Sequence, residues 1–259
     1  MEITTIAGIR ILQFHEINTL HGFTARSGGV SEGGYASLNF GRHSGDDASR
    51  VEKNFERLFH GLGIDASRVA MTSQSHSNHI RRIDGQGHGG VHEDTDGLMT
   101  NVPGMVLVTF YADCTPLYFY DPKHRVVAMA HAGWRGTLNG IARDMVRGLH
   151  REYGVRAGDL VVGIGPNLSK ERFEVGPDFP EDLVPEEDFS RYLDRSPGRI
   201  TFDMAGCNSF QLQEMGVLQE NIHLSNLCTY DEKDLFFSYR RQGRASGRMA
   251  GFIGLGEKI

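Results

Sequence analysis

The sequence predicts an α/β (α+β-like) protein with a central mixed β-sheet flanked by helices. Short apolar runs bounded by turn-forming residues recur along the 259-residue chain, which is typical of buried strands. Between them lie stretches whose apolar residues recur at helical spacing. No Pro/Ser-rich linker, charge block or shift in composition divides the sequence, so we expect residues 1–259 to form a single domain.

The N-terminal part is predicted to place one long helix between strands. Residues 3–14 are expected to form a strand or hairpin, followed by an ordered glycine-rich loop. A helix is predicted behind a capping Asp or Ser near Asp47, and Gly63 is expected to end it. Its apolar residues recur at helical spacing and are Val51, Phe55, Leu58, Phe59 and Leu62. Residues 68–76 are predicted to form a strand, and residues 84–96, rich in Gly, His and acidic residues, an exposed loop.

Apolar runs in close succession follow, and we expect them to pair in the central sheet. They occupy residues 105–113, 116–122 and 126–133. A helix is predicted over residues 139–153, with Gly154 as its end, and residues 160–165 supply the next strand, which completes an α/β unit. In the tail we expect a helix around residues 203–215, then strands within residues 221–229, 234–241 and 248–255.

The composition excludes several classes of protein. A formal net charge of −6 argues against nucleic acid as the main partner, because that binding needs a concentrated basic surface. No apolar run is long enough to span a bilayer, and the N-terminal segment lacks the basic start and unbroken apolar middle of a signal peptide. Cys114, Cys207 and Cys228 are widely spaced and odd in number, which favours reduced thiols. We therefore expect a cytoplasmic protein with no membrane partner.

Metal-capable side chains occur where three apolar strands end, at His76, Cys114 and His131. Because the ends of neighbouring strands in one sheet lie close in space, we expect these segments to deliver their ligands to one point. Imidazole nitrogen and thiolate sulfur suit zinc in a tetrahedral shell. With three protein ligands the fourth position stays open, as in catalytic zinc sites.

Other interpretations of these residues stay open from the pattern alone. A lone histidine at a strand end is often only hydrogen-bonded, and a lone cysteine among apolar residues is often a small core residue. A cysteine hydrolase would use Cys114 as its nucleophile and His131 or His76 as its base. A binding module would hold a structural metal in a closed four-ligand shell, with Cys228 or a loop histidine as the fourth ligand. The remaining nearby histidines are interpreted as residues without a metal role: His79, His88 and His92.

A series of short motifs runs along nearly the whole chain: TARSGGVS, SLNFG with GDD, QSH, DTDGL, ADCTP, HAGWRG, GIGP with FEVG, CTY, FFSYRRQG and GR. In this order they closely resemble the laccase-domain family, once called multicopper polyphenol oxidases and now described as zinc-binding purine nucleoside phosphorylases that also deaminate adenosine. Each motif is short, but so many in sequence do not arise by chance.

The resemblance implies a ligand set and a metal. The His of the family's Q-x-H motif, the Cys of ADC-x-P and the His of HAGWRG correspond to His76, Cys114 and His131. Zinc is the implied metal, with copper as a substitute. One departure is that the family often has Cys after GIGP, where this sequence has Asn167, so a thiol role at that position is absent.

The implied reactions are phosphorolysis of adenosine, inosine, guanosine and methylthioadenosine, and hydrolytic deamination of adenosine to inosine. The expected partners are thus purine nucleosides and phosphate. The family is also linked to peptidoglycan editing, which the cysteine-hydrolase alternative would serve. Copper oxidation of phenols is not expected, because trinuclear copper clusters use paired H-x-H ligands and none occurs among the 12 histidines. We expect a monomer or weak dimer.

Arginine is the natural phosphate holder because its guanidinium presents a fixed fork of donors. The candidates in family-like motifs are Arg26, Arg135 and Arg241, with Arg240 as the neighbouring choice, and a surface salt bridge is the alternative role of each. Asn39 of the SLNFG motif is also predicted to bind substrate.

Two carboxylates and the tryptophan complete the predicted site. Asp113 is expected to act in catalysis beside the three metal ligands, either in proton transfer or by supporting a ligand, and Asp96 is a candidate for the same work. Both could instead cap turns. Trp134 is a candidate for stacking on a purine, with plain packing as its alternative.

Overall fold

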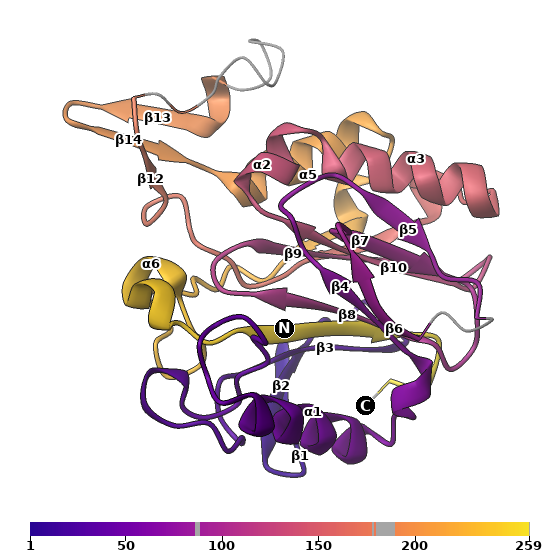
Figure 1. The fold of residues 1–259 in the computed structure, drawn as a ribbon. Coiled ribbons are helices and arrows are strands. Elements are labelled where there is room, and N and C mark those ends of the chain that lie inside the picture. The colour runs from indigo at the N-terminus through magenta and orange to yellow at the C-terminus, as the bar shows by residue number, and fades with distance from the viewer. Residues whose placement is uncertain (86–88, 178, 180–189, 259) are drawn as a thin grey trace.

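Two large β-sheets pack face to face in the computed structural model, and helices cover the outer face of each (Figure 1). The structure describes residues 1–85, 89–177, 179 and 190–258. The helices are α1 (Ala48–Leu62), α2 (Trp134–Leu138), α3 (Ile141–Tyr153), α5 (Met204–Glu214) and α6 (Tyr239–Gln242). Within this described part, no helix has the length and apolar character needed to cross a membrane.

The first sheet has seven strands in the order β1-β2-β3-β16-β8-β4-β6. Their bounds are β1 (Glu2–Ile6), β2 (Ile9–Gln13), β3 (Leu20–Thr24), β16 (Met249–Gly254), β8 (Val106–Tyr111), β4 (Val69–Ser73) and β6 (Gly90–Glu93). The strands pair antiparallel except at β4, which runs parallel to both β8 and β6. The predicted N-terminal hairpin is confirmed by the β1–β2 pair.

The second sheet has six strands in the order β15-β11-β9-β10-β7-β5. Their bounds are β15 (Ile222–Leu224), β11 (Val161–Ile164), β9 (Thr115–Asp121), β10 (Val126–Ala132), β7 (Gly97–Thr100) and β5 (Ile80–Arg82). A small third sheet of β12 (Glu174–Val175), β14 (Arg199–Phe202) and β13 (Leu193–Ser196) projects from one end of the molecule (Figure 1).

Side chains that alternate along the strands build the apolar layers. In β9, Tyr118 packs between the two sheets, whereas Leu117 and Phe119 pack under α3 and α5. Both sheets therefore bury both of their faces, and this accounts for the continuous apolar runs in the sequence.

Helix α1 forms where it was predicted. The Asp47 carboxylate accepts hydrogen bonds from the backbone N–H groups of Ser49 and Arg50, and Gly63 ends the helix in the left-handed region at φ 65°. One face of α1 packs on the outer face of the seven-stranded sheet through Val51, Phe55, Leu58 and Phe59.

The predicted α/β class with mixed sheets is confirmed, but the expected single central sheet is divided into two. Strand β8 lies in the seven-stranded sheet, whereas the next two runs, β9 and β10, lie in the six-stranded sheet. The chain crosses between the sheets after Tyr111. The physical reason is burial: each sheet covers one face with the other sheet and the second face with helices.

Two local predictions are wrong. Residues 234–241 form turns and the start of α6 instead of a strand, because the N–H groups of Leu235 and Phe236 donate to the Glu232 carbonyl in a turn and Ser238 caps the helix. Residues 84–96 are not all loop: β6 pairs with β4, and His92 is buried. Residues 86–88, and with them His88, lie outside the described residues. In the 221–229 run, the strand is limited to β15.

Candidate metal centre and active site

His76 lies just beyond β4, where the chain turns away from its sheet. The Gln74 side chain extends the pairing of β4 with β8, since its amide donates to the Phe110 carbonyl and accepts from the Phe110 N–H, both at 2.8 Å. His76 itself has φ 61°, a left-handed conformation that is uncommon for residues other than glycine. His76 therefore lies in the turn that follows β4 and not in the strand itself.

Cys114 and His131 lie in or next to the six-stranded sheet, which the chain enters after Tyr111. Cys114 sits directly before β9, after Asp113 at φ 87°, and His131 is the penultimate residue of β10, paired with Pro116. Cys114 and His131 thus lie at the ends of neighbouring strands of the six-stranded sheet, in line with the prediction, whereas His76 follows a strand of the other sheet. The three ligands meet where the two packed sheets end together.

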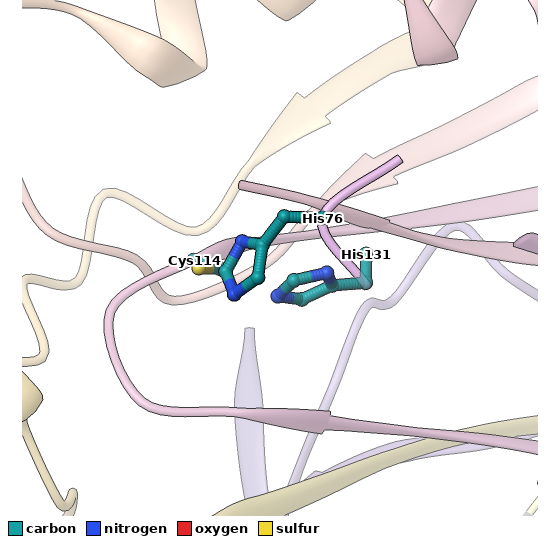
Figure 2. A group of neighbouring side chains, drawn as sticks. All are labelled: His76, Cys114 and His131. Atoms are coloured by element: carbon teal, nitrogen blue, oxygen red, sulfur yellow. The ribbon is translucent and has the colours of Figure 1, made fainter. Parts of the chain in front are cut away.

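The structure brings the three predicted ligands into one cluster (Figure 2). Donor atoms of His76, Cys114 and His131 all lie within 4.8 Å of one another. The two imidazole rings lie edge to face with their centroids 4.9 Å apart. His131 is buried, Cys114 is partly exposed and His76 is exposed, so the cluster opens to one side. No fourth His, Cys, Asp or Glu joins it among the described residues.

This donor set fits zinc. Two imidazoles and one thiolate are ligands that zinc prefers, and a set of three leaves one position of a tetrahedral shell for a substrate or water. The open side of the cluster is consistent with that arrangement. The same donors also bind copper, so the chemistry of the site does not by itself identify the metal.

Asp96, directly before β7, supports two of the three ligands. Its Oδ1 lies 2.8 Å from Nδ1 of His131, which leaves Nε2 of that ring for the cluster. The same carboxylate accepts hydrogen bonds from the backbone N–H groups of Ser75, His76 and Ser77 at 3.1, 3.2 and 2.9 Å. One buried side chain therefore fixes both the His131 ring and the turn that carries His76.

The Cys114 thiolate and the His131 imidazolium each stabilise the charged form of the other. Burial alone would raise the pKa of the Cys114 thiol, but the adjacent His131 and His76 rings outweigh burial and lower this pKa well below its ordinary value. Burial would lower the pKa of His131, but the Cys114 thiolate and the Asp96 carboxylate raise it. Cys114 is thus biased toward the thiolate, the form that binds metals.

Gly133 provides the space that the ligands occupy. A Cβ added at this position would lie 2.6 Å from Nδ1 of His76 and 3.3 Å from Sγ of Cys114. Gly133 has an ordinary φ of −71°, so the requirement for glycine comes from the neighbouring ligands and not from the backbone.

The three ligands line a cavity of about 910 Å³. Its wall combines apolar and aromatic side chains with arginines, as ligand-binding cavities commonly do. The aromatic and apolar lining includes Phe110, Trp134, Leu168, Phe173, Met204 and Tyr239. Trp134 is part of this wall and begins α2, and it also packs against Phe179 with ring centroids 5.3 Å apart.

The predicted substrate-binding residues lie in different places. Arg135 lines the cavity, is exposed, and stacks its guanidinium on Trp134 at 4.1 Å. Arg26 and Arg241 are not among the described residues that line it. The guanidinium of Arg26 donates to the Ala36 and Lys233 carbonyls, and that of Arg241 donates to three backbone carbonyls between residues 229 and 236.

Asn39 stands behind the cavity wall and does not line it. Its buried side chain accepts from the N–H groups of Gly41 and Arg248 and donates to Ser44 and Asp46. Because Gly41, Ser44 and Arg248 line the cavity, Asn39 holds two of its segments together.

Asp113 lines the cavity beside Cys114, and both of its oxygens are engaged. Oδ1 accepts from the Thr229 hydroxyl and Oδ2 accepts from the Arg240 N–H, each at 2.6 Å. Asp113 therefore ties the segment after β15 to the turn that carries Cys114. The catalytic role predicted for it stays a prediction.

The spare candidates lie outside the cluster. His79 contacts the Asp94 carboxylate at 3.0 Å, and His92 is buried in β6. Cys228 forms a bridge through its backbone with Asn167.

Arg248 was not identified from the sequence. It lines the cavity, is partly buried and directly precedes β16. The rule that located the metal ligands selects a polar residue that follows an apolar strand, whereas this arginine stands before one. The GR motif at this position was noted only as part of the resemblance.

Comparison with known proteins gives consistent matches along the chain. The family model described as multi-copper polyphenol oxidoreductase laccase matches residues 20–256. A protein named purine nucleoside phosphorylase YlmD from Geobacillus stearothermophilus is 36% identical over 247 residues, covering 92% of this chain and 90% of the relative. Its namesake from Bacillus subtilis is 33% identical over 270 residues, covering 98% and 97%.

Solved structures agree with the observed fold. The crystal structure of YlmD from Geobacillus stearothermophilus superimposes with a TM-score of 0.89 at 33% identity, covering 96% of this chain and 97% of that one. The hypothetical protein YfiH from Bacillus licheniformis gives a TM-score of 0.88 at 32% identity with the same coverage.

Proposed function

The chain belongs to the multi-copper polyphenol oxidoreductase laccase family, and on that premise we propose that it is a zinc-dependent purine nucleoside phosphorylase. The observation that carries the proposal is a three-ligand cluster, open on one side, in the wall of a cavity lined by aromatic rings and arginines. Such a cavity offers flat apolar surfaces for a purine and cationic groups for phosphate. Relatives at 33–36% identity carry the corresponding name.

The proposed reaction joins phosphate to the ribose. A phosphate oxygen forms a bond to C1′, the C1′–N9 bond breaks, and its electron pair stays on the purine. The proton that hydrogen phosphate loses ends on the purine, so nucleoside and phosphate give free base and ribose 1-phosphate. Adenosine, inosine, guanosine and methylthioadenosine are the proposed nucleosides.

The position of each residue in the site suggests its role in the reaction. His76, Cys114 and His131 would hold the zinc, which when bound supplies a Lewis acid at the cavity wall. Asp96 orients two of these ligands. The aromatic wall excludes water from the bound nucleoside, and Asp113, beside Cys114, is the proposed proton-transfer group.

Deamination of adenosine is a second candidate function of the same site. Adenosine and water would give inosine and ammonia, with a new C6–O bond replacing the C6–N bond. It is favoured by the set of only three protein donors, with one open side facing the cavity, an arrangement that other zinc deaminases use.

A product analysis tests the proposal. Metal-analysed protein is incubated with adenosine, with and without phosphate, and inosine, adenine and ribose 1-phosphate are separated. We expect adenine and ribose 1-phosphate only when phosphate is present, and inosine in both incubations. Absence of adenine and ribose 1-phosphate in the presence of phosphate would overturn the phosphorylase proposal, whatever the yield of inosine.

The cysteine-hydrolase alternative is separated from zinc binding by alkylation. A thiol beside two imidazoles also suits a nucleophile, which could act in peptidoglycan editing. In the zinc-bound protein we expect Cys114 to be protected from iodoacetamide and to become reactive after a chelator is added. Protein that lacks zinc and alkylates equally with and without the chelator would favour the hydrolase.

A further inference from the structure

The cavity wall is cationic although the chain as a whole is acidic. The formal net charge is −6, yet the described lining includes the arginines Arg42, Arg135, Arg240 and Arg248 and only two carboxylates, Glu93 and Asp113. A concave site lined by one sign of charge concentrates oppositely charged ligands. The cavity is therefore suited to an anion.

Three of these arginines are less suited than the fourth to bind an anion. Arg42 is held in an ion pair with Glu52 at 2.9 Å. Arg240 donates from Nη2 to the Glu174 carbonyl. Arg135 is exposed and stacked on Trp134, so water screens its charge.

Arg248 differs from them in how its guanidinium is held. Nη1 donates to the carbonyls of Ser246 and Gly247 at 2.7 and 3.0 Å, which fixes the plane of the group. Nε and Nη2 make no hydrogen bond or ion pair with any residue in the described ranges. These two nitrogens form the edge of a guanidinium that binds two oxygens of a phosphate in parallel.

The backbone at Arg248 is held in a fixed position. Its backbone N–H donates to Oδ1 of the buried Asn39 at 2.8 Å, and the next residue begins β16 in the middle of the seven-stranded sheet. The side chain is partly buried, and its guanidinium carbon lies 5.9 Å from the centre of the Tyr239 ring. Burial lowers the pKa of Arg248 from an ordinary value far above neutrality, so the group stays cationic.

We propose that the Nε–Nη2 edge of Arg248 binds the phosphate co-substrate. This assignment rests on the proposed phosphorylase function. It moves the phosphate contact from Arg26 and Arg241, whose guanidinium groups are occupied by backbone carbonyls, to Arg248. That residue lines the cavity, and its Nε–Nη2 edge has no partner among the described residues.

The test compares Arg248→Gln, Arg248→Lys and a matched control, Arg244→Gln, which removes the same charge from an exposed site four residues away. For each protein, KM for phosphate and KM for inosine are measured. Stabilisation by inorganic phosphate is measured separately as a shift in Tm, because a ligand that binds the folded state raises Tm.

We expect Arg248→Gln to raise KM for phosphate by about 10- to 100-fold, the loss of one or two charge-assisted hydrogen bonds, with KM for inosine nearly unchanged. Phosphate should no longer raise Tm of this variant. Arg248→Lys, which keeps the charge but not the fork, should fall between it and the wild type. Arg244→Gln should match the wild type.

The outcomes separate this inference from the proposed function. If wild-type protein forms no ribose 1-phosphate but phosphate still stabilises it and not Arg248→Gln, the function fails and the anion site stands. If phosphate stabilises Arg248→Gln and the wild type equally, or stabilises neither, the anion site is overturned. An equal rise in both KM values would also overturn it, because that result indicates general damage to the cavity.

Discussion

The carboxylate of Asp96 accepts a hydrogen bond from Nδ1 of the buried His131 at 2.8 Å. Through the backbone N–H groups of Ser75, His76 and Ser77, the same carboxylate also holds the turn of the second imidazole ligand. Burial would raise the pKa of Asp96, but these hydrogen bonds and His131 lower it, so it is ionised. Asp96 links strand β7 to both histidines of the cluster.

Asp96→Asn is predicted to weaken zinc binding by about 10- to 100-fold, the usual effect of losing a carboxylate behind a ligand histidine. The substituted amide would turn its NH2 group either toward the N–H donors of the 75–77 turn or toward Nδ1 of His131. One ligand therefore loses its support in either orientation. Competition with a zinc chelator measures the change.

Asp94→Asn is the matched control, because Asp94 is an exposed acid close by that contacts Ser75 and His79. Its zinc affinity should equal that of the wild type. Equal affinities for wild type and Asp96→Asn would show that the carboxylate does not support the ligands.

Gly133→Ala is predicted to reduce zinc content and activity together. The added methyl group would lie 2.6 Å from Nδ1 of His76, so the ring must leave its place in the cluster. The chain should still fold, because φ at this position is −71° and suits alanine. Zinc per chain and inosine phosphorolysis are the measurements.

Gly158→Ala serves as the comparison, since the nearest described atom to a Cβ there is the Gly216 carbonyl oxygen at 3.9 Å. This variant should bind zinc normally. A Gly133→Ala protein with full zinc content would contradict the observed packing around the ligands.

Acid should destabilise the fold through His21, which is fully buried between the two sheets. Nε2 accepts from the Phe14 N–H and Nδ1 donates to the Thr19 carbonyl, so both ring nitrogens are satisfied by the neutral form. Burial lowers the pKa of His21 to about 4, with Lys258 acting in the same direction and Glu2 opposing it. Well above pH 6.5 the ring is neutral in both the folded and the unfolded chain, so His21 does not lower the free energy of unfolding there.

As the pH falls from 6.5 toward 4, the unfolded chain takes up a proton that folded His21 does not, so the free energy of unfolding falls. The loss is about 2–3 kcal/mol at the low end of this window. His21→Gln removes the titration, so the advantage of the wild type over this variant should narrow with falling pH. A gap that stays constant with pH would show that His21 does not titrate in this way.

The strands and the metal ligands were predictable for a common reason. An apolar run followed by a turn residue marks both the strand and the point where a polar side chain leaves the core, as at His76 after β4. The assignment of strands to sheets was not predictable. Alternation along β9 shows that both faces are buried, but it does not show whether a second sheet or a helix covers each face.

The orientation of the arginine side chains was also not predictable from the sequence. Arg26 and Arg248 both lie in family-like motifs, but a motif does not show how its guanidinium is held. The carbonyls of the preceding Ser246 and Gly247 hold that of Arg248, whereas segments farther along the chain hold that of Arg26. Lys233 contributes one of the carbonyls that hold Arg26. Residues 234–241 were misread because two adjacent buried phenylalanines in an irregular segment have the same composition as a strand.

Cys114→Ala tests the central claim, that one metal cluster serves the proposed chemistry, most directly. Zinc per chain, ribose 1-phosphate formed from inosine and phosphate, and inosine formed from adenosine are measured on the same preparation, with Tm as the check on folding. We predict that zinc falls from about one per chain to almost none and that both reactions are lost. A folded, zinc-free Cys114→Ala protein with full phosphorolysis would contradict the account.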